Sequence, residues 1–360
     1  MSYHICVYAI AKNESQFVDR FMDSMQEADS VCVLDTGSQD DTVEKLRARG
    51  AIVEREIITP WRFDVARNRS MRLIPPQADI CACIDLDEVF QSGWREKLER
   101  AWRENTTRAQ YRYTWSFRPD GSEGHVFWTD KIHKNGVYRW VGAVHETLQY
   151  IGEGKEIFTA AEGVQLDHHP DDTKSRGQYL PLLELAVQED PHSDRNRHYL
   201  GREYMFHGLW QKAIDTLLYH LSMPESTWAD ERCASMRFIA RSYEALGNRQ
   251  EAKRWLARAI GEAPHLREGY VDYAMELYRE ENWAGVAYFA LQALQITERP
   301  RTYICESDAW GPLPYDLAAL AHYHLGQYDA AVRYGTAAVQ SDQSDSRLAQ
   351  NLSFYRDAIG

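Results

Sequence analysis

The first hundred residues alternate short apolar runs with segments of helical periodicity. Four apolar runs have the length and composition of buried strands, at residues 3–10, 31–34, 51–53 and 80–84. Three segments between them carry apolar residues at helical spacing, at residues 16–27, 41–49 and 67–73. This βαβ progression predicts an α/β fold with a mainly parallel sheet covered on both faces. In such a fold, ligands bind beyond the carboxyl ends of the strands.

The pattern changes between about residues 106 and 167. Aromatic and polar side chains alternate at residues 110–117, 125–128 and 136–140, and four glycines punctuate the segment as turns would. We expect these stretches to add antiparallel strands to the sheet.

Beyond Thr173 the chain has helical periodicity and repeats itself. A small residue is followed at +3 by a large one and at +12 by a residue suited to close helix contact. The four units begin at Gly201, Ala240, Ala274 and Ala319. Three of them have a glycine at +7, where the turn between two antiparallel helices would lie. The pattern resembles the tetratricopeptide repeat, whose stacked helix pairs form a concave surface for a partner, and the alternative is an irregular helical bundle.

Composition narrows the classes of partner. The 360 residues carry a formal net charge of −13, which argues against general binding of nucleic acid, although a local basic groove stays possible. No apolar run approaches the length of about 20 residues needed to span a membrane, and the first residues lack a signal-peptide pattern. We therefore expect a cytoplasmic protein without a membrane span. Its six cysteines lack CxxC spacing and are expected to be reduced, buried thiols.

The most informative motif is Ile84-Asp-Leu-Asp-Glu88, directly after the strand expected at 80–84. Asp85 and Asp87 lie two residues apart where this strand ends. Carboxylate oxygens in such a position can hold Mg²⁺ or Mn²⁺ bridging a diphosphate, and the alternative is a turn with solvated side chains.

Polar residues also follow the first two strands. Asp35 comes after the second strand, where it could hydrogen-bond a base or ribose, Gly37 permits a tight turn, and Asp40 or Asp41 can cap the next helix. Lys12, Asn13 and Glu14 follow the first strand. The alternative for the second loop is helix capping alone.

Arg67 and Asn68 lie before the metal candidate in the chain, near the start of a helix. Lys12 and Arg67 could neutralise phosphate charge, and Asn68 could supply hydrogen bonds. Each residue taken singly is equally consistent with a surface ion pair.

Taken in order, AKNE at 11–14, DTGSQDDT at 35–42, RN at 67–68 and IDLDE at 84–88 resemble family 2 glycosyltransferases with the A-type fold. The resemblance implies a Rossmann-like nucleotide-diphospho-sugar transferase domain at residues 1–172 and a tetratricopeptide-like domain at 173–360. It also implies transfer of a sugar from a nucleotide diphosphate donor, UDP-hexose being favoured, usually with inversion at the anomeric carbon. By position, Asp35 would meet the nucleobase, Asp85 the ribose or sugar, and Asp87 the Mn²⁺ or Mg²⁺ cofactor.

Two later motifs are candidates for the acceptor side of this site. His145 could complete the metal coordination, and the alternative is a structural hydrogen bond. Glu146 could take the acceptor proton as catalytic base, with Asp120, Glu123 and Asp130 as competitors for that role. Further along, His168 and His169 are adjacent metal candidates, of which at most one suits the same ion. Lys174 and Arg176 could close over the diphosphate, and the alternative for residues 167–176 is a hinge with a capped helix.

The combination of such a domain with helical repeats looks like repeat-bearing peptide and protein glycosyltransferases. The resemblance implies a peptide, protein or glycan acceptor selected by the repeats, or self-association through them. Two other functions stay open. One is an inactive transferase-like domain that serves a repeat-based interaction module, and the other is a sugar nucleotidyltransferase, whose glycine-rich, lysine-bearing signature is missing.

Overall fold

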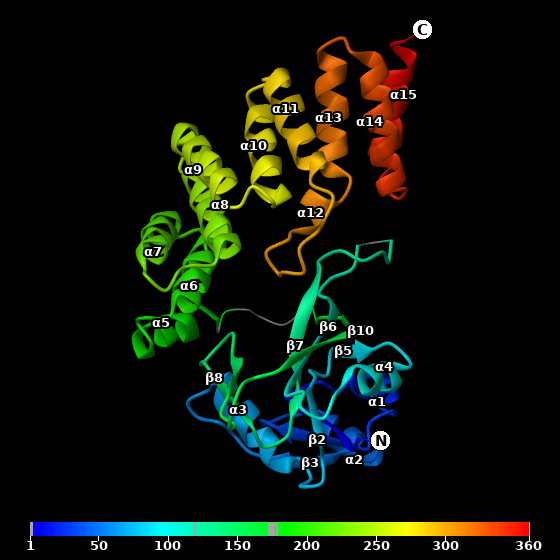
Figure 1. Ribbon diagram of the computed structural model, residues 1–360, viewed down its shortest axis with the longest axis vertical. Coiled ribbons are helices and arrows are strands. Elements are labelled where there is room, and N and C mark those ends of the chain that lie inside the picture. The colour runs from blue at the N-terminus through cyan, green and yellow to red at the C-terminus, as the bar shows by residue number, and fades with distance from the viewer. Residues whose placement is uncertain (1–2, 119, 172–176, 178, 360) are drawn as a thin grey trace. The chain divides into compact units, whose positions relative to one another are not determined.

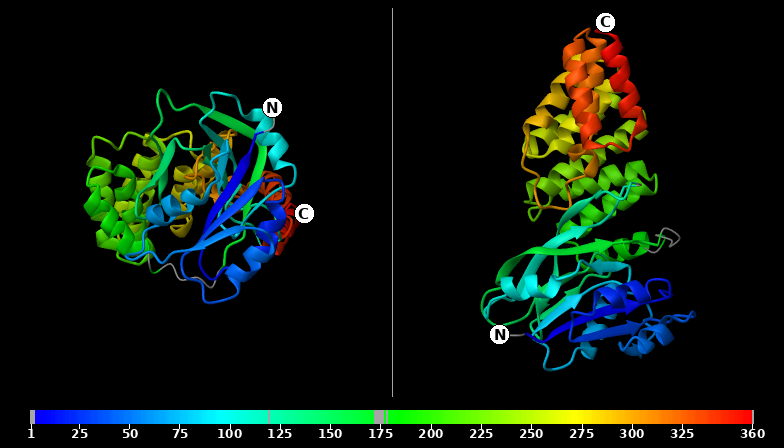
Figure 2. Two further views of the ribbon diagram at one scale, coloured as in Figure 1. Left: turned by 90° about the horizontal axis from the view of Figure 1, so that it is seen from below. Right: turned by 90° about the vertical axis from the view of Figure 1, so that its right-hand side faces the viewer.

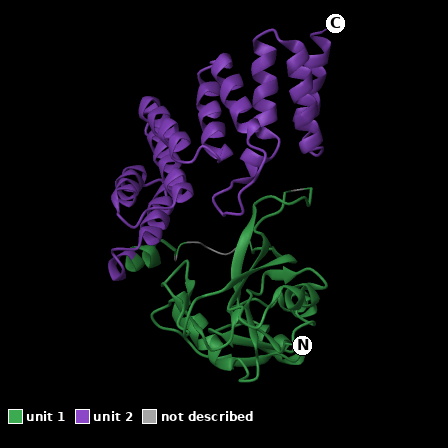
Figure 3. Ribbon diagram, in the orientation of Figure 1, with its two compact units in different colours: residues 1–186 green, residues 187–360 purple. Residues whose placement is uncertain are grey.

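The computed structural model describes residues 3–118, 120–171, 177 and 179–359. The chain divides into two compact units, residues 1–186 and 187–360, which Figure 3 colours separately. The dividing point lies within α5 (Tyr179–Glu189). The predicted boundary between residues 172 and 173 falls outside the described residues.

Unit 1 is built on one large sheet with helices between its first strands (Figure 1). Its strands are β1 (Ile5–Ala11), β2 (Ser30–Asp35), β3 (Ile52–Arg55), β4 (Ile80–Cys83), β5 (Glu88–Phe90), β6 (Arg108–Thr114), β7 (Val126–Lys134) and β10 (Phe158–His168). Its helices before α5 are α1 (Val18–Ser24), α2 (Thr42–Ala48), α3 (Phe63–Ser70), the 3-10 turn η1 (Met71–Leu73) and α4 (Trp94–Ala101). The predicted βαβ progression is confirmed for all four early strands.

The eight strands follow the order β3-β2-β1-β4-β7-β6-β10-β5. The first four run parallel to one another, β7 is antiparallel to both β4 and β6, and β10 is parallel to β6. The sheet is therefore mixed. The antiparallel additions expected at 110–117 and 125–128 are confirmed.

The stretch at 136–140 departs from expectation. It forms β8 (Tyr138–Val141), which pairs with β9 (Thr147–Tyr150) in a separate two-stranded sheet. The physical reason is that the second face of the large sheet is also apolar and has to be covered. On this face, Cys6 and Tyr8 of β1 pack against Tyr138, Trp140 and Leu148 of the ribbon. The ribbon therefore covers the large sheet and does not extend it.

The alternation along β1 explains why the strand reads as uniformly apolar. Ile5, Val7 and Ala9 belong to the main core, whereas Cys6 and Tyr8 face the ribbon. Both faces of the central strands are buried, as the βαβ pattern predicts. All six cysteines of the chain are free and buried.

The regular secondary structure described in unit 2 consists of helices alone. Its helices are α6 (Asp194–Phe206), α7 (Trp210–Ser222), α8 (Ala229–Ala245), α9 (Arg249–Glu262), α10 (Arg267–Arg279), α11 (Trp283–Gln295), α12 (Ser307–Trp310), α13 (Leu313–His324), α14 (Tyr328–Ser341) and α15 (Ser346–Asp357). Successive helices pack against one another, and α13, α14 and α15 lie side by side in Figures 1 and 2. None of the described helices is long and apolar enough to cross a membrane.

The four predicted repeat units coincide with helix pairs α6–α7, α8–α9, α10–α11 and α13–α14. Gly208, Gly247 and Gly326 have φ values of 70°, 81° and 72° at the predicted turns. The third unit has Glu281 at the same place with φ of 54°, a conformation that costs a non-glycine residue roughly 1–2 kcal/mol. The turn at +7 therefore requires a residue with positive φ, and three of the four units meet this requirement with glycine.

Close helix contact explains the small residue that begins each unit. A Cβ added at Gly201 of α6 would lie 2.5 Å from Leu217 of α7. The +12 residues Ala213, Ala252 and Ala331 are buried as well. Helical repeats made of stacked antiparallel pairs are thus a property of this chain.

Candidate active site at the strand ends

Three loops gather at the carboxyl edge of the parallel strands. Residues 12–14 follow β1, residues 36–41 follow β2, and residues 84–87 follow β4, and these three strands are neighbours in the sheet. Because the strands are parallel, the loops leave the sheet at one edge.

The loops after β1 and β2 are bonded to each other. The backbone N–H of Asn13 donates to Ser38 Oγ at 2.8 Å, and Asn13 Oδ1 accepts from the backbone N–H of Gln39 at 2.8 Å. The Glu14 N–H donates to Thr42 Oγ1 at 2.8 Å, and Lys12 is exposed beside them. Asn13 has φ of 56°, so this loop holds a left-handed residue to make the contacts.

Asp40 ties the second loop to α2. Its Oδ1 accepts the Thr42 backbone N–H at 3.1 Å, while Asp41 occupies the N-cap position without a side-chain cap bond. Asp40 therefore supplies the capping function expected of one of the two residues.

Asp35 closes β2 with a carboxylate that is fully buried. Oδ1 accepts the backbone N–H groups of Gly37 and Ser38, each at 3.2 Å, and the Arg55 Nε–H at 3.0 Å. Gly37 has φ of 116°, which confirms the tight turn expected there. The structure places Asp35 as the organiser of residues 35–38, paired with Arg55 of β3; its carboxylate is 0% exposed and so is not open to the expected nucleobase contact.

Arg67 of α3 joins two of the predicted site residues. Its Nη1 and Nη2 donate to the two oxygens of Asp85 at 2.8 and 3.0 Å, and its Nε donates to Glu146 Oε1 at 2.6 Å. The guanidinium lies 5.3 Å from the centre of the Trp140 ring, and Arg67 is only 4% exposed. A paired, planar donor of this kind fixes both carboxylates.

The charge of Asp85 is balanced from two sides. Burial alone would raise the pKa of Asp85, but Arg67 and Lys131 outweigh burial and hold that pKa well below its usual range. Lys131 Nζ lies 3.5 Å from Asp85 Oδ2 and 3.3 Å from Oε1 of the buried Glu88. Glu88 in turn accepts the Asp85 backbone N–H at 2.8 Å. Asp85 is thus a fixed anion at neutral pH.

Asp87 lies beside His168 at the end of β10. His168 Nδ1 is 2.9 Å from the Trp115 carbonyl, so Nδ1–H donates there and Nε2 faces Asp87 Oδ2 at 3.4 Å. The His168 ring stacks on Trp115, with ring centres 4.5 Å apart. Burial would lower the pKa of His168, but Asp87 and the Trp115 carbonyl raise it. The position between Nε2 and the carboxylate therefore favours a positive charge, either a proton or a metal ion.

The other predicted ligands are placed apart from this pair. The His169 ring stacks on Phe117 at 5.2 Å, and the His145 ring packs against Tyr179 at 5.9 Å, with His145 at φ of 49°. Among the residues that the structure describes, no three of Asp87, His145, His168 and His169 bring ligand atoms within 4.8 Å of one another. The expected set of Asp87, His145 and one of the two adjacent histidines is therefore not assembled in the described residues.

Asn68 has a different role from the expected one. Its Nδ2 donates to the Trp140 carbonyl at 2.8 Å, and its Oδ1 accepts the Trp140 N–H at 2.9 Å. Both polar atoms hold β8 against α3, so Asn68 positions the ribbon. Lys174 and Arg176 lie outside the described residues.

Two residues of the site were missed by sequence reasoning. Arg55 lies at the end of β3 and Lys131 lies on β7, strands that the sheet order brings to the same edge. A basic residue at the end of a strand was the available signal for Arg55. Nothing local marks Lys131, because its partner Asp85 is distant in the chain.

Comparison with known proteins gives no family. No protein-family model matches the chain, and no curated protein matches it. Solved structures with some likeness include MamA (18% identity, TM-score 0.37, 47% of this chain and 89% of that one). They also include a tetratricopeptide protein of Thermus thermophilus (17%, 0.36, 51% and 91%) and PilF of Pseudomonas aeruginosa (12%, 0.38, 49% and 72%). At these identities and scores the likeness carries no argument; the helix pairs of the chain itself support the repeats.

Proposed function

We propose that unit 1 is a metal-dependent glycosyltransferase domain. It would move a sugar from a nucleotide diphosphate, UDP-hexose being favoured, to a peptide, protein or glycan selected by the helical repeats. The observation that carries the proposal is the meeting of three polar loops at one sheet edge, with Asp87 paired to His168 and Asp85 held by Arg67.

The residues at this edge suit a divalent ion. Asp87 offers a carboxylate and His168 offers Nε2, and the hydrogen bond from His168 Nδ1 to a carbonyl is the arrangement that orients a metal-bound imidazole. A mixed oxygen and nitrogen pair favours Mn²⁺ over Mg²⁺. When bound there, the ion would supply positive charge to the diphosphate leaving group.

The chain's own residues would supply the remaining functions. Arg67 and Lys131 hold Asp85 as an anion, fixed to hydrogen-bond the hydroxyls of the ribose or sugar. Glu146 is held by Arg67 through Oε1, and Oε2 is the oxygen assigned to the acceptor proton.

The reaction is a single displacement. The acceptor's nucleophilic atom bonds to the anomeric carbon, while the bond from that carbon to the diphosphate oxygen breaks with its electron pair. The acceptor proton passes to Glu146, and the nucleoside diphosphate leaves with inverted stereochemistry in the product. Positive charge near the leaving oxygens lowers the barrier because negative charge develops there.

Donor hydrolysis tests the proposal. The full chain is incubated with UDP-, GDP- and dTDP-hexoses and Mn²⁺, and release of nucleoside diphosphate is measured with and without chelator. Asp87→Asn keeps the side-chain size and should lower metal-dependent release by about 100-fold or more. The matched control Asp329→Asn makes the same chemical change at an exposed position of α14 and should keep the wild-type rate. Equal rates for Asp87→Asn and wild type would remove Asp87 from the reaction.

Calorimetry with UDP tests the second loop. Asp35→Ala removes the acceptor that holds the N–H groups of Gly37 and Ser38, so the loop loses its turn and UDP affinity should fall about tenfold. Unchanged affinity in a folded variant would leave Asp35 with a structural role only.

A second candidate is an inactive transferase-like unit that serves a repeat-based interaction module. The observation that favours it is the carboxylate of Asp35, which is fully buried and already paired with Arg55. This candidate predicts that none of the donors binds or is hydrolysed, with or without Mn²⁺.

A further inference from the structure

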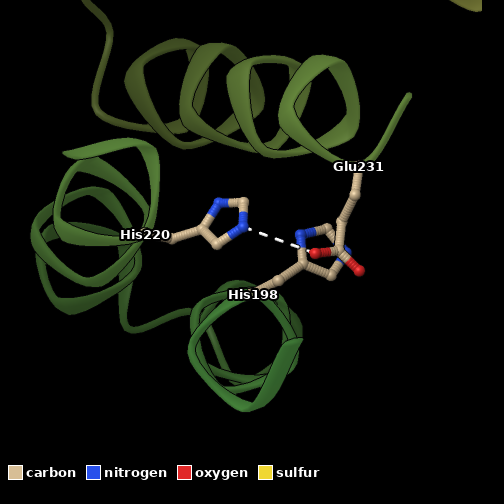
Figure 4. Close-up of side chains that lie close together, drawn as sticks. All are labelled: His198, His220 and Glu231. Carbon is tan, nitrogen blue, oxygen red and sulfur yellow. Dashed lines mark ion pairs between the residues drawn. The ribbon is translucent and has the colours of Figure 1, made fainter. Parts of the chain in front are cut away.

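A second cluster of potential metal ligands lies far from these loops in the chain, inside unit 2. His198 of α6, His220 of α7 and Glu231 of α8 place one ligand atom each within 4.8 Å of the others (Figure 4). Their exposed fractions are 1%, 0% and 4%. We propose that these three residues bind Zn²⁺ between the first three helices of unit 2.

The spacing of the ligand atoms fits a shared ion. His220 Nε2 and Glu231 Oε1 are 3.4 Å apart, which is long for a hydrogen bond. Zinc bonds of about 2.0–2.1 Å in a tetrahedral site place neighbouring ligand atoms about 3.3 Å apart. Imidazole ligands select zinc and its transition-metal neighbours over Mg²⁺ or Ca²⁺.

The surroundings orient the ligands as a metal site requires. Ser235 Oγ lies 2.7 Å from His198 Nδ1 and 3.0 Å from His220 Nδ1, so one hydroxyl oxygen can accept both Nδ1–H groups. This leaves the Nε2 lone pairs of both rings for the ion. Tyr303 donates to Glu231 Oε2 at 2.8 Å, which leaves Oε1 as the ligand oxygen.

Charge supports the same conclusion. Glu231 is a buried carboxylate, and its ion-pair partner among the described residues is the imidazole of His220. A buried carboxylate is costly without a full positive charge nearby. As ligands, the two imidazoles and the carboxylate carry a charge of −1 toward a cation, while Arg195 and Arg202 act on His198 with the opposite sign. Ser226 Oγ lies 3.0 Å from His220 Nε2 and marks the side on which a fourth ligand, a hydroxyl or a water, would complete the tetrahedron.

The alternative is a metal-free polar network in which His220 Nε2–H is shared between Ser226 and Glu231. The two arrangements differ in what the folded chain retains. A zinc site retains one equivalent of metal through dialysis, whereas the network retains none.

Metal content and a spectroscopic probe decide between them. The full chain is unfolded with chelator, refolded with Zn²⁺ or Co²⁺, dialysed, and analysed for bound metal by mass spectrometry. We expect one equivalent in the wild type, and visible absorption of tetrahedral Co²⁺ with nitrogen and oxygen ligands. Glu231→Gln keeps size and should lower retained zinc at least tenfold, and Ser235→Ala should weaken zinc affinity by about 10–100-fold.

Two control variants separate this site from other causes. His265→Gln changes a histidine of unit 2 that also contacts a carboxylate, with His265 Nε2 at 2.8 Å from Asp230 Oδ1, and should keep one equivalent. Asp87→Asn should also keep it, which distinguishes the site from the metal proposed at the strand ends. A refolded wild type without retained zinc, or with no Co²⁺ spectrum, would overturn the proposal even if the variants fail to fold.

Discussion

Both units contain a buried arginine that lies between two acids, and a comparison of Arg67 with Arg237 shows two different settings for it. Arg67 of unit 1 is 4% exposed and contacts Asp85 and Glu146, which belong to loops at strand ends. Arg237 of unit 2 is 1% exposed and contacts Asp272 of α10 and Glu306 before α12. Both arginines make the same kind of contact, in which a buried guanidinium pairs with two carboxylates. A buried ion pair therefore does not mark an active site by itself; the candidate site of unit 1 rests on the polar loops around Arg67 as well.

The two arginines also differ in what their acids keep when the arginine is removed. Arg241 contacts Asp272 at 3.2 Å and Glu306 at 2.8 Å and would still pair them without Arg237, whereas Glu146, whose side chain is 11% exposed, would lose Arg67. Arg67→Met should lower the free energy of unfolding by about 3–5 kcal/mol, and Arg237→Met by less. Urea denaturation measures both. The control Arg100→Met breaks an exposed pair with Glu96 and should change stability by at most about 0.5 kcal/mol. Equal losses for the two buried arginines would contradict this compensating role of Arg241.

Helix contact distinguishes unit 2 from the sheet of unit 1. Gly201→Ala would press a methyl group against Leu217 and should destabilise the chain by about 1–3 kcal/mol. Gly261, near the end of α9, has nothing within 4 Å of an added Cβ, so Gly261→Ala should stabilise by about 0.5–1 kcal/mol. Thermal unfolding measures whether each variant is less or more stable than the wild type. If the two variants shifted in the same direction, close packing of α6 on α7 would not explain Gly201.

The repeat turns offer a smaller, paired test. Glu281→Gly replaces the residue with φ of 54° and should stabilise by about 1 kcal/mol. Gly247→Ala, at φ of 81° with open space around it, should destabilise by a similar amount. In denaturant titrations, the two variants should change the free energy of unfolding in opposite directions. A neutral Glu281→Gly would mean that the backbone at 281 carries no conformational cost.

The last comparison concerns pH and a histidine of unit 1. Burial lowers the pKa of His133 to about 4, and the ring is held neutral where its Nε2 accepts from Tyr8 and its Nδ1–H donates to the Lys134 carbonyl. Between about pH 6.5 and 4 the unfolded chain binds this proton and the folded chain does not. Stability should therefore fall as pH drops through this window, by about 1 kcal/mol per unit, and stay level above it.

His133→Gln should remove that part of the pH dependence. The control His192→Gln, at a side chain that is 85% exposed, should retain it. Free energies of unfolding at pH 5 and pH 7 give the comparison, and His198, whose pKa burial lowers to about 3, contributes equally to both variants. Identical slopes for the two variants would show that His133 takes up its proton in the folded chain.

Most of the local structure, meaning the strands and the turns, could be predicted from the sequence. The strands at 3–10 and 80–84 and the glycines at 208, 247 and 326 depend on alternation and turn geometry, which a short window contains. The same holds for the edge at which Asp35, Asp85 and Asp87 gather, because parallel strands place their following loops together.

What the sequence could not predict depends on distant pairing. Glu88 belongs to an acidic motif, yet it is 1% exposed because Tyr113 and Lys131 arrive from other strands. Asn68 has a polar side chain beside Arg67, but its partner is the backbone of Trp140, 72 residues away. The histidine and glutamate ligands inside unit 2 come from three different helices, with no motif spacing between them.

The buried thiols allow the opening of each unit to be timed separately. Burial raises the pKa of Cys83 in β4 and of Cys233 in α8 to about 12, and both side chains are inaccessible. A thiol reagent reacts with thiolate that it can reach, so neither cysteine reacts until its surroundings open. The rate at which Cys83 is labelled therefore reports the opening of the sheet, and the rate for Cys233 reports the separation of the helices. In one sample, mass spectrometry of the two peptides would show which half of the chain opens first.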